Sequence, residues 1–252
     1  MADNRTIYNT HYTAGQLDLP TDPYDRHVAD ARLAMVREFA PGRDVLDLCC
    51  GTGSYLIPFL DDVNSAVGVD FSEKMLQGFR DRLRDGSPAK LKLIEADATA
   101  LPLAGALFDF VFSFTALYYL ENVEDAVCEA ARVLRPGGHA VLEFGNSNSL
   151  TTPVTRGFHE AKGWARSFPV PPARITGMVR RAGFTILRVR RFQILPLLGA
   201  PPGMAWLKPM ASPRLKPLLG ARIGARSLDE LLSALWPLSR FAFRHILVVK
   251  KT

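Results

Sequence analysis

Short apolar runs recur along the chain and are separated by segments in which apolar residues return with helical spacing. This alternation predicts a parallel β-sheet covered by helices. The run at 108–114 is apolar enough to be buried on both faces, as a central strand would be. We predict seven strands, at residues 44–49, 65–70, 91–97, 108–114, 139–145, 184–192 and 241–251.

Helical segments lie before and between these strands. Apolar residues share one face of a predicted helix over 72–85, for which Ser72 is a suitable N-cap. Ser227 and Glu230 form a capping box at the start of another helix, over 227–238. Further helices are predicted over 22–39, 52–60, 123–134 and 173–183.

Composition narrows the class of protein. With 252 residues, 48% of them hydrophobic, the chain can form one sizeable α/β domain or two small ones. No window approaches the roughly 18 to 20 consecutive apolar residues of a membrane-spanning helix, and the N-terminal segment is polar, unlike a signal peptide. We therefore expect a cytoplasmic protein.

Three cysteines and five histidines limit the redox and metal chemistry that the chain can support. Cys49 and Cys50 are adjacent in the sequence, and adjacent cysteines do not readily bridge each other. The histidines show no close pairing with one another or with the cysteines. We expect neither a disulfide framework nor a bound metal.

The net charge of +6 conceals an uneven distribution. Residues 1–150 contain 13 Lys and Arg against 22 Asp and Glu, a balance of −9, whereas residues 151–252 contain 18 against 3, a balance of +15. A half so poor in acids favours contact with a phosphate, a carboxylate, a nucleic acid or a lipid surface. A basic, solvated surface without a partner would have the same composition.

The stretch VLDLCCGTG at 45–53 joins a predicted strand to a glycine-rich turn. Glycines in such a turn let backbone N–H groups approach a ligand closely. Leu56 stands where the dinucleotide fingerprint G-x-G-x-x-G would have its last glycine, and no phosphate-binding Gly-Lys-Ser/Thr follows. The turn alone is therefore a weak signal.

Three acids accompany three successive predicted strands: Asp47, Asp70 and Asp97. The carboxyl ends of neighbouring parallel strands line one crevice, so Asp70 would lie beside the glycine turn and could bind a ribose diol. Each acid alone could be an ordinary helix N-cap. Together they favour a cationic nucleoside ligand, because carboxylates repel phosphate.

Five stretches of the chain, taken in order, resemble the motifs of class I S-adenosylmethionine-dependent methyltransferases. They are VLDLCCGTG, VGVDFSEKML, LIEADATALPL, FDFVFSFTALYYL and ARVLRPGGHAVL, within about residues 40–192. The resemblance implies a Rossmann-like α/β fold with a seven-stranded, mostly parallel sheet, an antiparallel last strand and helices on both faces. It also implies a helical lid at 1–40, a methyltransferase domain at 41–252 and a substrate-cap insertion at about 193–226.

The resemblance further implies S-adenosyl-L-methionine as methyl donor and S-adenosyl-L-homocysteine as product. The glycines would pass beneath the methionine part, Asp47 would reach its ammonium group, and Asp70 would hold the ribose. Phe71 and Met75 would flank the adenine. The family's usual first glycine is replaced by Cys49. The implied cofactor-binding residues are Asp47, Cys49, Gly51, Gly53, Asp70, Phe71, Met75, Asp97, Ala98, Ser113, Phe114 and, from the lid, Tyr12, with Tyr8 beside it.

The methyl acceptor is expected to contact 145–172 and 193–226, which combine aromatic and apolar residues with cations. We predict a small or lipid-like acceptor with an anionic group, methylated on oxygen, nitrogen or carbon by in-line displacement. If the acceptor is a hydroxyl, His159 is the first candidate for a general base and His11 the second. Peripheral contact of 207–224 with a membrane surface is a further expectation.

Other functions stay open at this point. The basic second half fits an RNA methyltransferase, although FSFTALYYL lacks the Asn-Pro-Pro type of signature of base-amino methyltransferases and no RNA-binding module is evident. An NAD-dependent oxidoreductase shares the fold class, and a cofactor-binding protein without turnover would share the motifs. Both cysteines are interpreted as small buried hydrophobes, with a redox pair as the alternative.

Overall fold

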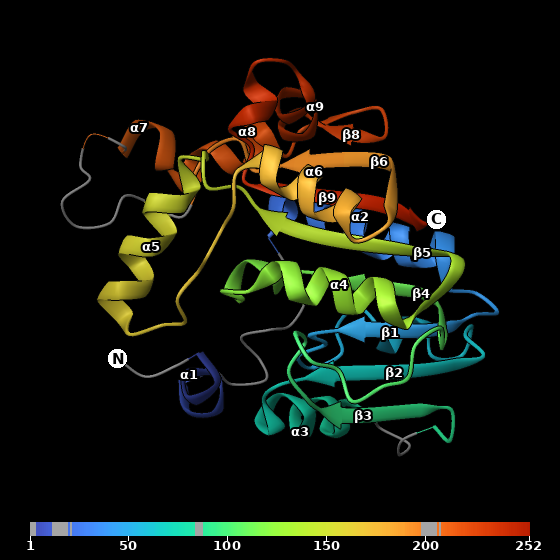
Figure 1. The fold of residues 1–252 in the computed structure, drawn as a ribbon. Helices are drawn as coiled ribbons and strands as arrows, with labels where there is room; N and C mark the ends of the chain where they lie inside the picture. Colours follow the sequence, from blue (N-terminus) through green and yellow to red (C-terminus); the bar gives the residue numbers. More distant parts are fainter. Residues whose placement is uncertain (1–3, 12–19, 21, 84–87, 198–205, 207) are drawn as a thin grey trace.

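The computed structural model describes residues 4–11, 20, 22–83, 88–197, 206 and 208–252. Seven strands form one sheet in the order β3-β2-β1-β4-β5-β9-β6 (Figure 1), and β9 runs antiparallel to both of its neighbours. The other neighbouring pairs are parallel, which confirms the predicted α/β sheet. The strands are β1 (Asp44–Leu48), β2 (Ser65–Asp70), β3 (Leu91–Glu95), β4 (Phe108–Ser113), β5 (Leu134–Gly145), β6 (Phe184–Phe192) and β9 (Arg244–Lys251).

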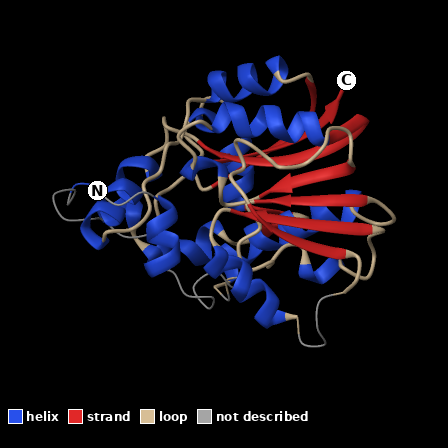
Figure 2. Ribbon diagram, turned by 60° about the horizontal axis from the view of Figure 1, so that its bottom comes forward, coloured by secondary structure: helices blue, strands red, loops and turns tan. Residues whose placement is uncertain are grey.

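Helices cover both faces of the sheet (Figure 2). Met35 and Val36 of α2 belong to the apolar core on one face, and Val127 of α4 and Met178 of α6 belong to the core on the other. The helices are α1 (Asn4–His11), α2 (Pro23–Phe39), α3 (Glu73–Arg82), α4 (Val123–Val133), α5 (Thr151–Lys162), α6 (Pro172–Arg181), α7 (Lys208–Ala211), α8 (Lys216–Leu219) and α9 (Leu228–Ala234). A short hairpin, β7 (Arg222–Ile223) and β8 (Arg226–Ser227), precedes α9.

Two helix starts confirm the predicted caps. The Ser72 hydroxyl accepts a hydrogen bond from the Met75 N–H at 3.3 Å, and the Ser227 hydroxyl accepts one from the Glu230 N–H at 3.1 Å. Each hydroxyl satisfies a backbone donor that the first helical turn leaves without an intrahelical partner.

The structure departs from the sequence pattern in two segments. Residues 52–60 do not form the predicted helix but only a 3₁₀ turn at Ile57–Phe59, in which Pro58 has no N–H to continue a helix. The pattern does not predict α5, because its threonines, Pro153 and Gly157 all lower helix propensity. Buried Val154 and Thr155 show that packing stabilises α5 instead.

The strand order creates a crevice at one edge of the sheet. The chain proceeds outward from β1 to β3 on one side and continues through β4 and β5 on the other. Such a reversal leaves a space at the carboxyl ends of the central strands, where ligands bind in open α/β sheets. Figure 1 shows α1 beyond these strand ends.

Candidate active site

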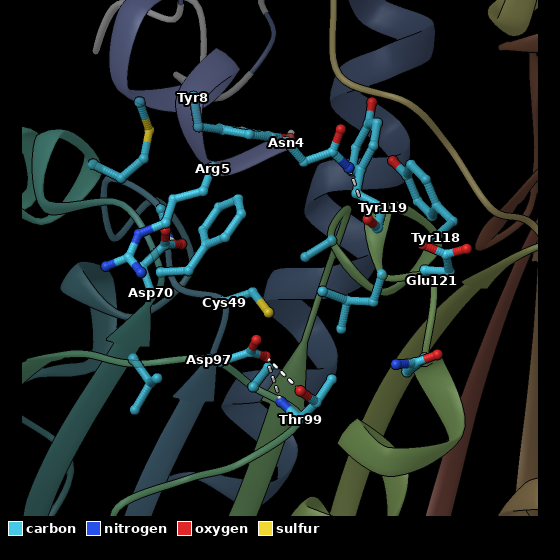
Figure 3. Close-up of a pocket in the computed structure, with 18 of the residues that line it drawn as sticks. Asn4, Arg5, Tyr8, Cys49, Asp70, Asp97, Thr99, Tyr118, Tyr119 and Glu121 are labelled. Atoms are coloured by element: carbon cyan, nitrogen blue, oxygen red, sulfur yellow. Dashed lines mark hydrogen bonds between the residues drawn. The ribbon is translucent and has the colours of Figure 1, made fainter. Parts of the chain in front are cut away.

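A cavity of about 690 Å³ occupies this crevice. Figure 3 shows Asp70, Cys49 and Asp97 on the strand side, residues of α1 above them, and Tyr118, Tyr119 and Glu121 opposite. The volume lies within the roughly 300 to 1,000 Å³ of small-molecule sites. Seven of the predicted cofactor-binding residues line it: Cys49, Gly51, Asp70, Phe71, Met75, Asp97 and Ala98.

The turn after β1 has the backbone of a glycine loop even where it lacks a glycine. Cys49 has φ of 62° and Gly51 has φ of 51°, both in the left-handed region. A side chain in that region costs about 1 to 2 kcal/mol, so Cys49 adopts a conformation that suits the glycine it replaces. The turn brings the Gly51 N–H to the Asp70 Oδ2 at 2.9 Å.

Asp70 is buried and held in place by the backbone. Its carboxylate accepts hydrogen bonds from the N–H groups of Gly51 and Ser72, at 2.9 and 3.0 Å. Burial raises the pKa of Asp70 to about 6, although these backbone donors act in the opposite direction. The carboxylate is therefore ionised near neutral pH and fixed in orientation at the cavity wall.

The two other strand-end acids differ in environment. Burial raises the pKa of Asp47 well above its usual range, and the charge of Asp70 raises it further. Asp47 does not line the cavity. Asp97 does, and its Oδ1 accepts hydrogen bonds from the N–H and the hydroxyl of Thr99 at 2.8 and 2.7 Å (Figure 3). This orients the Asp97 carboxylate.

Helix α1 is attached to the cavity rim on opposite sides. The Asn4 amide donates to the backbone carbonyls of Tyr119 and Arg166, both at 2.9 Å, and its Oδ1 accepts from the Arg166 N–H at 2.8 Å. Tyr8 contacts Phe71 edge-on, with ring centroids 5.4 Å apart, and Arg5 pairs with Glu95 of β3. These contacts make α1 a cover over the cavity.

Besides Asp47, four predicted cofactor-binding residues do not line the cavity or lie outside the described residues. Gly53 does not line the cavity; a Cβ on it would lie 2.5 Å from the ring of Phe79, so packing against α3 requires glycine here. Ser113 and Phe114 are buried at the end of β4 and do not line the cavity either. Tyr12 is outside the described residues, and of His11 only its place at the end of α1 is described. Their cofactor contacts stay predictions.

A second hollow, of about 760 Å³, adjoins the first and shares Glu121, Arg166 and Phe168 with it. His159, the predicted general base, lines this hollow and not the first cavity. Its ring stacks on Tyr119 with centroids 6.0 Å apart and an interplanar angle of 8°. Arg156, Arg174 and Trp164 line the same hollow, and with Arg166 its arginines outnumber its acids, Glu121 and Glu160, by three to two.

Burial lowers the pKa of His159, although the Ala165 carbonyl acts to raise it. The ring is therefore neutral at neutral pH. Its Nδ1 donates to that carbonyl, which leaves Nε2 as the nitrogen that can accept a proton.

Tyr118 connects the cavity to a buried ion-pair network. Glu143 of β5 is fully buried, accepts from Arg32 Nε and Nη2 at 2.7 and 2.9 Å, and pairs with Arg244. Arg244 also donates to the Tyr118 hydroxyl at 3.3 Å. Burial acts to raise the pKa of Glu143, but the charges of Arg32 and Arg244 outweigh it and hold the pKa below its usual value.

Several residues that line the cavity could not be predicted from the sequence motifs. Asn4 and Arg5 lie in a short polar segment without apolar periodicity, and Glu121 carries no motif. Tyr118 and Tyr119 lie at the end of the fourth motif, FDFVFSFTALYYL, and their position beyond a strand end was the one available signal.

The cysteines do not have the environment of a redox pair. Burial raises the pKa of both Cys49 and Cys50 well above the usual value, and the nearby charges of Asp70 and Asp47 raise it further. Such thiols stay protonated and unreactive at neutral pH. Within the described residues no group of three or more His, Cys, Asp or Glu could hold a metal ion.

Comparisons with known proteins support a single family. Residues 46–142 match the family model described as a methyltransferase domain. The demethylmenaquinone methyltransferase of Lactococcus lactis subsp. lactis (strain IL1403) is 36% identical over 106 residues, which cover 40% of this chain and 41% of that enzyme. The enzyme of the same name from Listeria monocytogenes serotype 4b (strain CLIP80459) is 30% identical over 174 residues, covering 58% of this chain and 72% of that enzyme.

A solved structure extends the likeness over the whole fold. The magnesium protoporphyrin IX methyltransferase of Synechocystis PCC 6803, with bound S-adenosylhomocysteine (SAH), superposes with a TM-score of 0.60 at 18% identity, covering 98% of each chain. That identity supports the fold alone. The glycine turn, the strand-end acids and the match to the Listeria enzyme agree: this chain belongs to the class I S-adenosylmethionine-dependent methyltransferase family.

Proposed function

We propose that this protein transfers a methyl group from S-adenosylmethionine to a small, apolar acceptor that carries an anionic group. The observation that carries the proposal is the junction of two differently charged spaces. In the first cavity acids outnumber arginines three to two: Asp70, Asp97 and Glu121 against Arg5 and Arg166. In the adjoining hollow arginines outnumber acids three to two: Arg156, Arg166 and Arg174 against Glu121 and Glu160. A cationic donor suits the first space and an anionic acceptor the second.

The residues of the first cavity fit the cofactor. Asp70, fixed by two backbone donors, accepts hydrogen bonds from the ribose hydroxyls, and Phe71 and Met75 flank the adenine. Asp97, oriented by Thr99, accepts from the adenine amino group. When bound, S-adenosylmethionine supplies an activated methyl group on a sulfonium cation.

The chain's own residues then align the acceptor and exclude water. Helix α1 covers the cavity through Asn4, and Tyr119 separates it from the ring of His159. Such alignment supplies much of the acceleration in a displacement that needs little acid or base catalysis. With a hydroxyl acceptor, His159 receives the proton at Nε2, because its Nδ1 donates to the Ala165 carbonyl.

The chemical class of the acceptor follows from the second hollow. Trp164 and Phe168 provide aromatic surface, and the three arginines have no ion-pair partner among the described residues. An anionic group on the acceptor would supply the missing counter-charge. The relatives named demethylmenaquinone methyltransferase support a small-molecule acceptor for this chain.

Paired variants test the acceptor site. In Arg156→Ala/Arg174→Ala we expect KM for an anionic aromatic acceptor to rise about 10- to 100-fold, because hydrogen bonds to charged groups contribute roughly 1.5 to 3 kcal/mol. SAH binding, measured by titration calorimetry, should not change. Arg180→Ala is the matched control, since Arg180 is exposed on α6 and lines neither space.

Two results would contradict this function. One is that the double variant methylates anionic acceptors as well as the wild type does. The acceptor would then not bind in the second hollow. Tight, salt-sensitive binding of RNA in a filter assay, with methyl transfer to it, would favour the RNA methyltransferase alternative.

A further inference from the structure

The C-terminal part of the chain presents large apolar side chains to solvent. Ten large hydrophobic side chains are exposed among the described residues, and six of them lie between positions 218 and 241. Trp236 is 79% exposed, the highest value of the ten. We call the six the apolar face: Leu218, Ile223, Leu235, Trp236, Leu238 and Phe241.

The apolar face belongs to one compact unit. Helix α8, the β7–β8 hairpin and α9 pack together at the top of Figure 1, beside the β6 edge of the sheet. The Leu228 N–H donates to the Ala221 carbonyl at 2.9 Å, and the Ser239 N–H donates to the Leu235 carbonyl at 2.7 Å. The first bond closes the β7–β8 hairpin between α8 and α9, and the second lies within the turn that follows α9.

No acidic side chain is exposed on this unit. After Glu160 the sequence contains only two acids, Asp229 and Glu230. Asp229 is fully buried and accepts the N–H groups of Gln193 and Ile194 at 2.7 and 2.9 Å. Glu230 is 3% exposed and pairs with Arg190. Both acids are therefore buried and already paired inside the fold.

Exposed cations accompany the apolar face in the sequence. Four exposed arginines belong to the same stretch: Arg214, Arg222, Arg226 and Arg240. Arg214 and Arg240 have no ion-pair partner in the part of the chain that the structure describes. The partly exposed acids nearby, Asp22 and Asp25 at the start of α2, pair with Lys216 of α8. Large apolar side chains and unpaired cations, with no exposed acid on the unit itself, complement a surface that is both apolar and anionic.

We propose that the apolar face docks on an anionic phospholipid membrane. Leucine, isoleucine and aromatic side chains enter the boundary between headgroups and acyl chains, where tryptophan is favoured, and the arginines meet lipid phosphates. None of the helices described is long and apolar enough to cross a membrane, so the contact is peripheral. The aliphatic members favour lipid over RNA, because proteins bind single-stranded RNA by aromatic stacking and cations.

Vesicle cosedimentation of the full chain tests the apolar part of the proposal. We expect binding to phosphatidylcholine vesicles that contain about 30 mol% phosphatidylglycerol, and much weaker binding to phosphatidylcholine alone. Leu235→Ser/Trp236→Ser should lower the affinity at least about tenfold, because burying two such side chains is strongly favourable. Leu107→Ser is the matched control: Leu107 is 38% exposed and precedes β4, outside the apolar face.

A second pair of variants tests the charges. Arg214→Glu/Arg240→Glu should lower affinity for the anionic vesicles about 25-fold or more, since each cation near such a surface contributes roughly fivefold. Lys92→Glu, an exposed cation of β3 at the opposite edge of the sheet, should not change it. Calorimetric SAH binding should be the same in all variants, which shows that they are folded and separates this proposal from methyl transfer.

Four outcomes would overturn the proposal. The first is that the protein sediments with neither vesicle, and the second is that it binds neutral and anionic vesicles equally. The third is that the control variants lose as much affinity as the test variants. The fourth is salt-sensitive RNA binding that persists in Leu235→Ser/Trp236→Ser, without vesicle binding. A dimer in sedimentation velocity that this same variant dissociates, without vesicle binding, would assign the apolar face to self-association instead.

Discussion

Single residues in unfavourable environments line the candidate site. Cys49 has the backbone of a glycine, and Asp70 is a buried carboxylate whose pKa is raised to about 6. Asp47 is buried nearby and its pKa is raised as well. Proteins keep such strained or desolvated groups chiefly at sites that bind a ligand, where the ligand compensates for them.

Buried Glu143 stabilises the fold beside the cavity through its ion pairs with two arginines. Glu143→Gln would leave Arg32 and Arg244 buried without a carboxylate, so we expect the free energy of unfolding to fall by about 3 to 5 kcal/mol. Urea denaturation measures this loss. Glu38→Gln is the control, because the exposed Glu38–Arg188 pair should contribute less than about 1 kcal/mol. Equal losses in both variants would contradict the role given to the network.

Among the elements, α1 is a cover joined to several parts of the cavity rim by side chains. Asn4 joins it to the segments that follow β4 and α5, and the Ser72 hydroxyl donates to Asn9 at 2.6 Å. Such side-chain contacts can break locally while the core stays folded. Ligand entry beneath α1 is therefore compatible with a rigid sheet.

Asn4→Ala tests this cover. Losing its three side-chain hydrogen bonds should weaken SAH binding at least about tenfold, because each bond contributes roughly 0.5 to 1.5 kcal/mol. The free energy of unfolding should change little, and the two quantities can be measured by calorimetry and by urea denaturation. Thr176→Ala is the control, since the Thr176 hydroxyl donates to the Pro172 carbonyl within its own helix. Unchanged SAH binding in Asn4→Ala would show that α1 does not cover the cofactor.

Across the whole molecule, acids and cations are unevenly distributed along the chain. Asp70 and Asp97 of the acid-rich first half line the first cavity, and Arg156 and Arg174 of the basic second half line the second hollow. The apolar face also belongs to the second half. The sheet could be predicted because each strand is a short apolar run bounded by turn residues. Strand order then places the acids of successive strands in one crevice.

The remaining features could not be read from local patterns. The bond from Asn4 to Tyr119 joins residues 115 positions apart, and no motif marks Asn4. Gly53 belongs to a recognisable glycine turn, but only the packed Phe79 ring shows why it must be glycine. The turn at 52–60 and helix α5 depend on tertiary packing that overrides local propensity.

Titration calorimetry with SAH, from about pH 7.5 to about pH 5, tests the central claim that this crevice holds the cofactor. In the proposed site, ribose hydroxyls would donate to ionised Asp70, so the affinity should be constant above its pKa of about 6 and fall about tenfold one pH unit below it. Asp70→Asn should bind about 5- to 150-fold more weakly at neutral pH and lose this pH dependence. Absent SAH binding, or an Asp70→Asn variant with wild-type affinity and pH profile, would contradict the account.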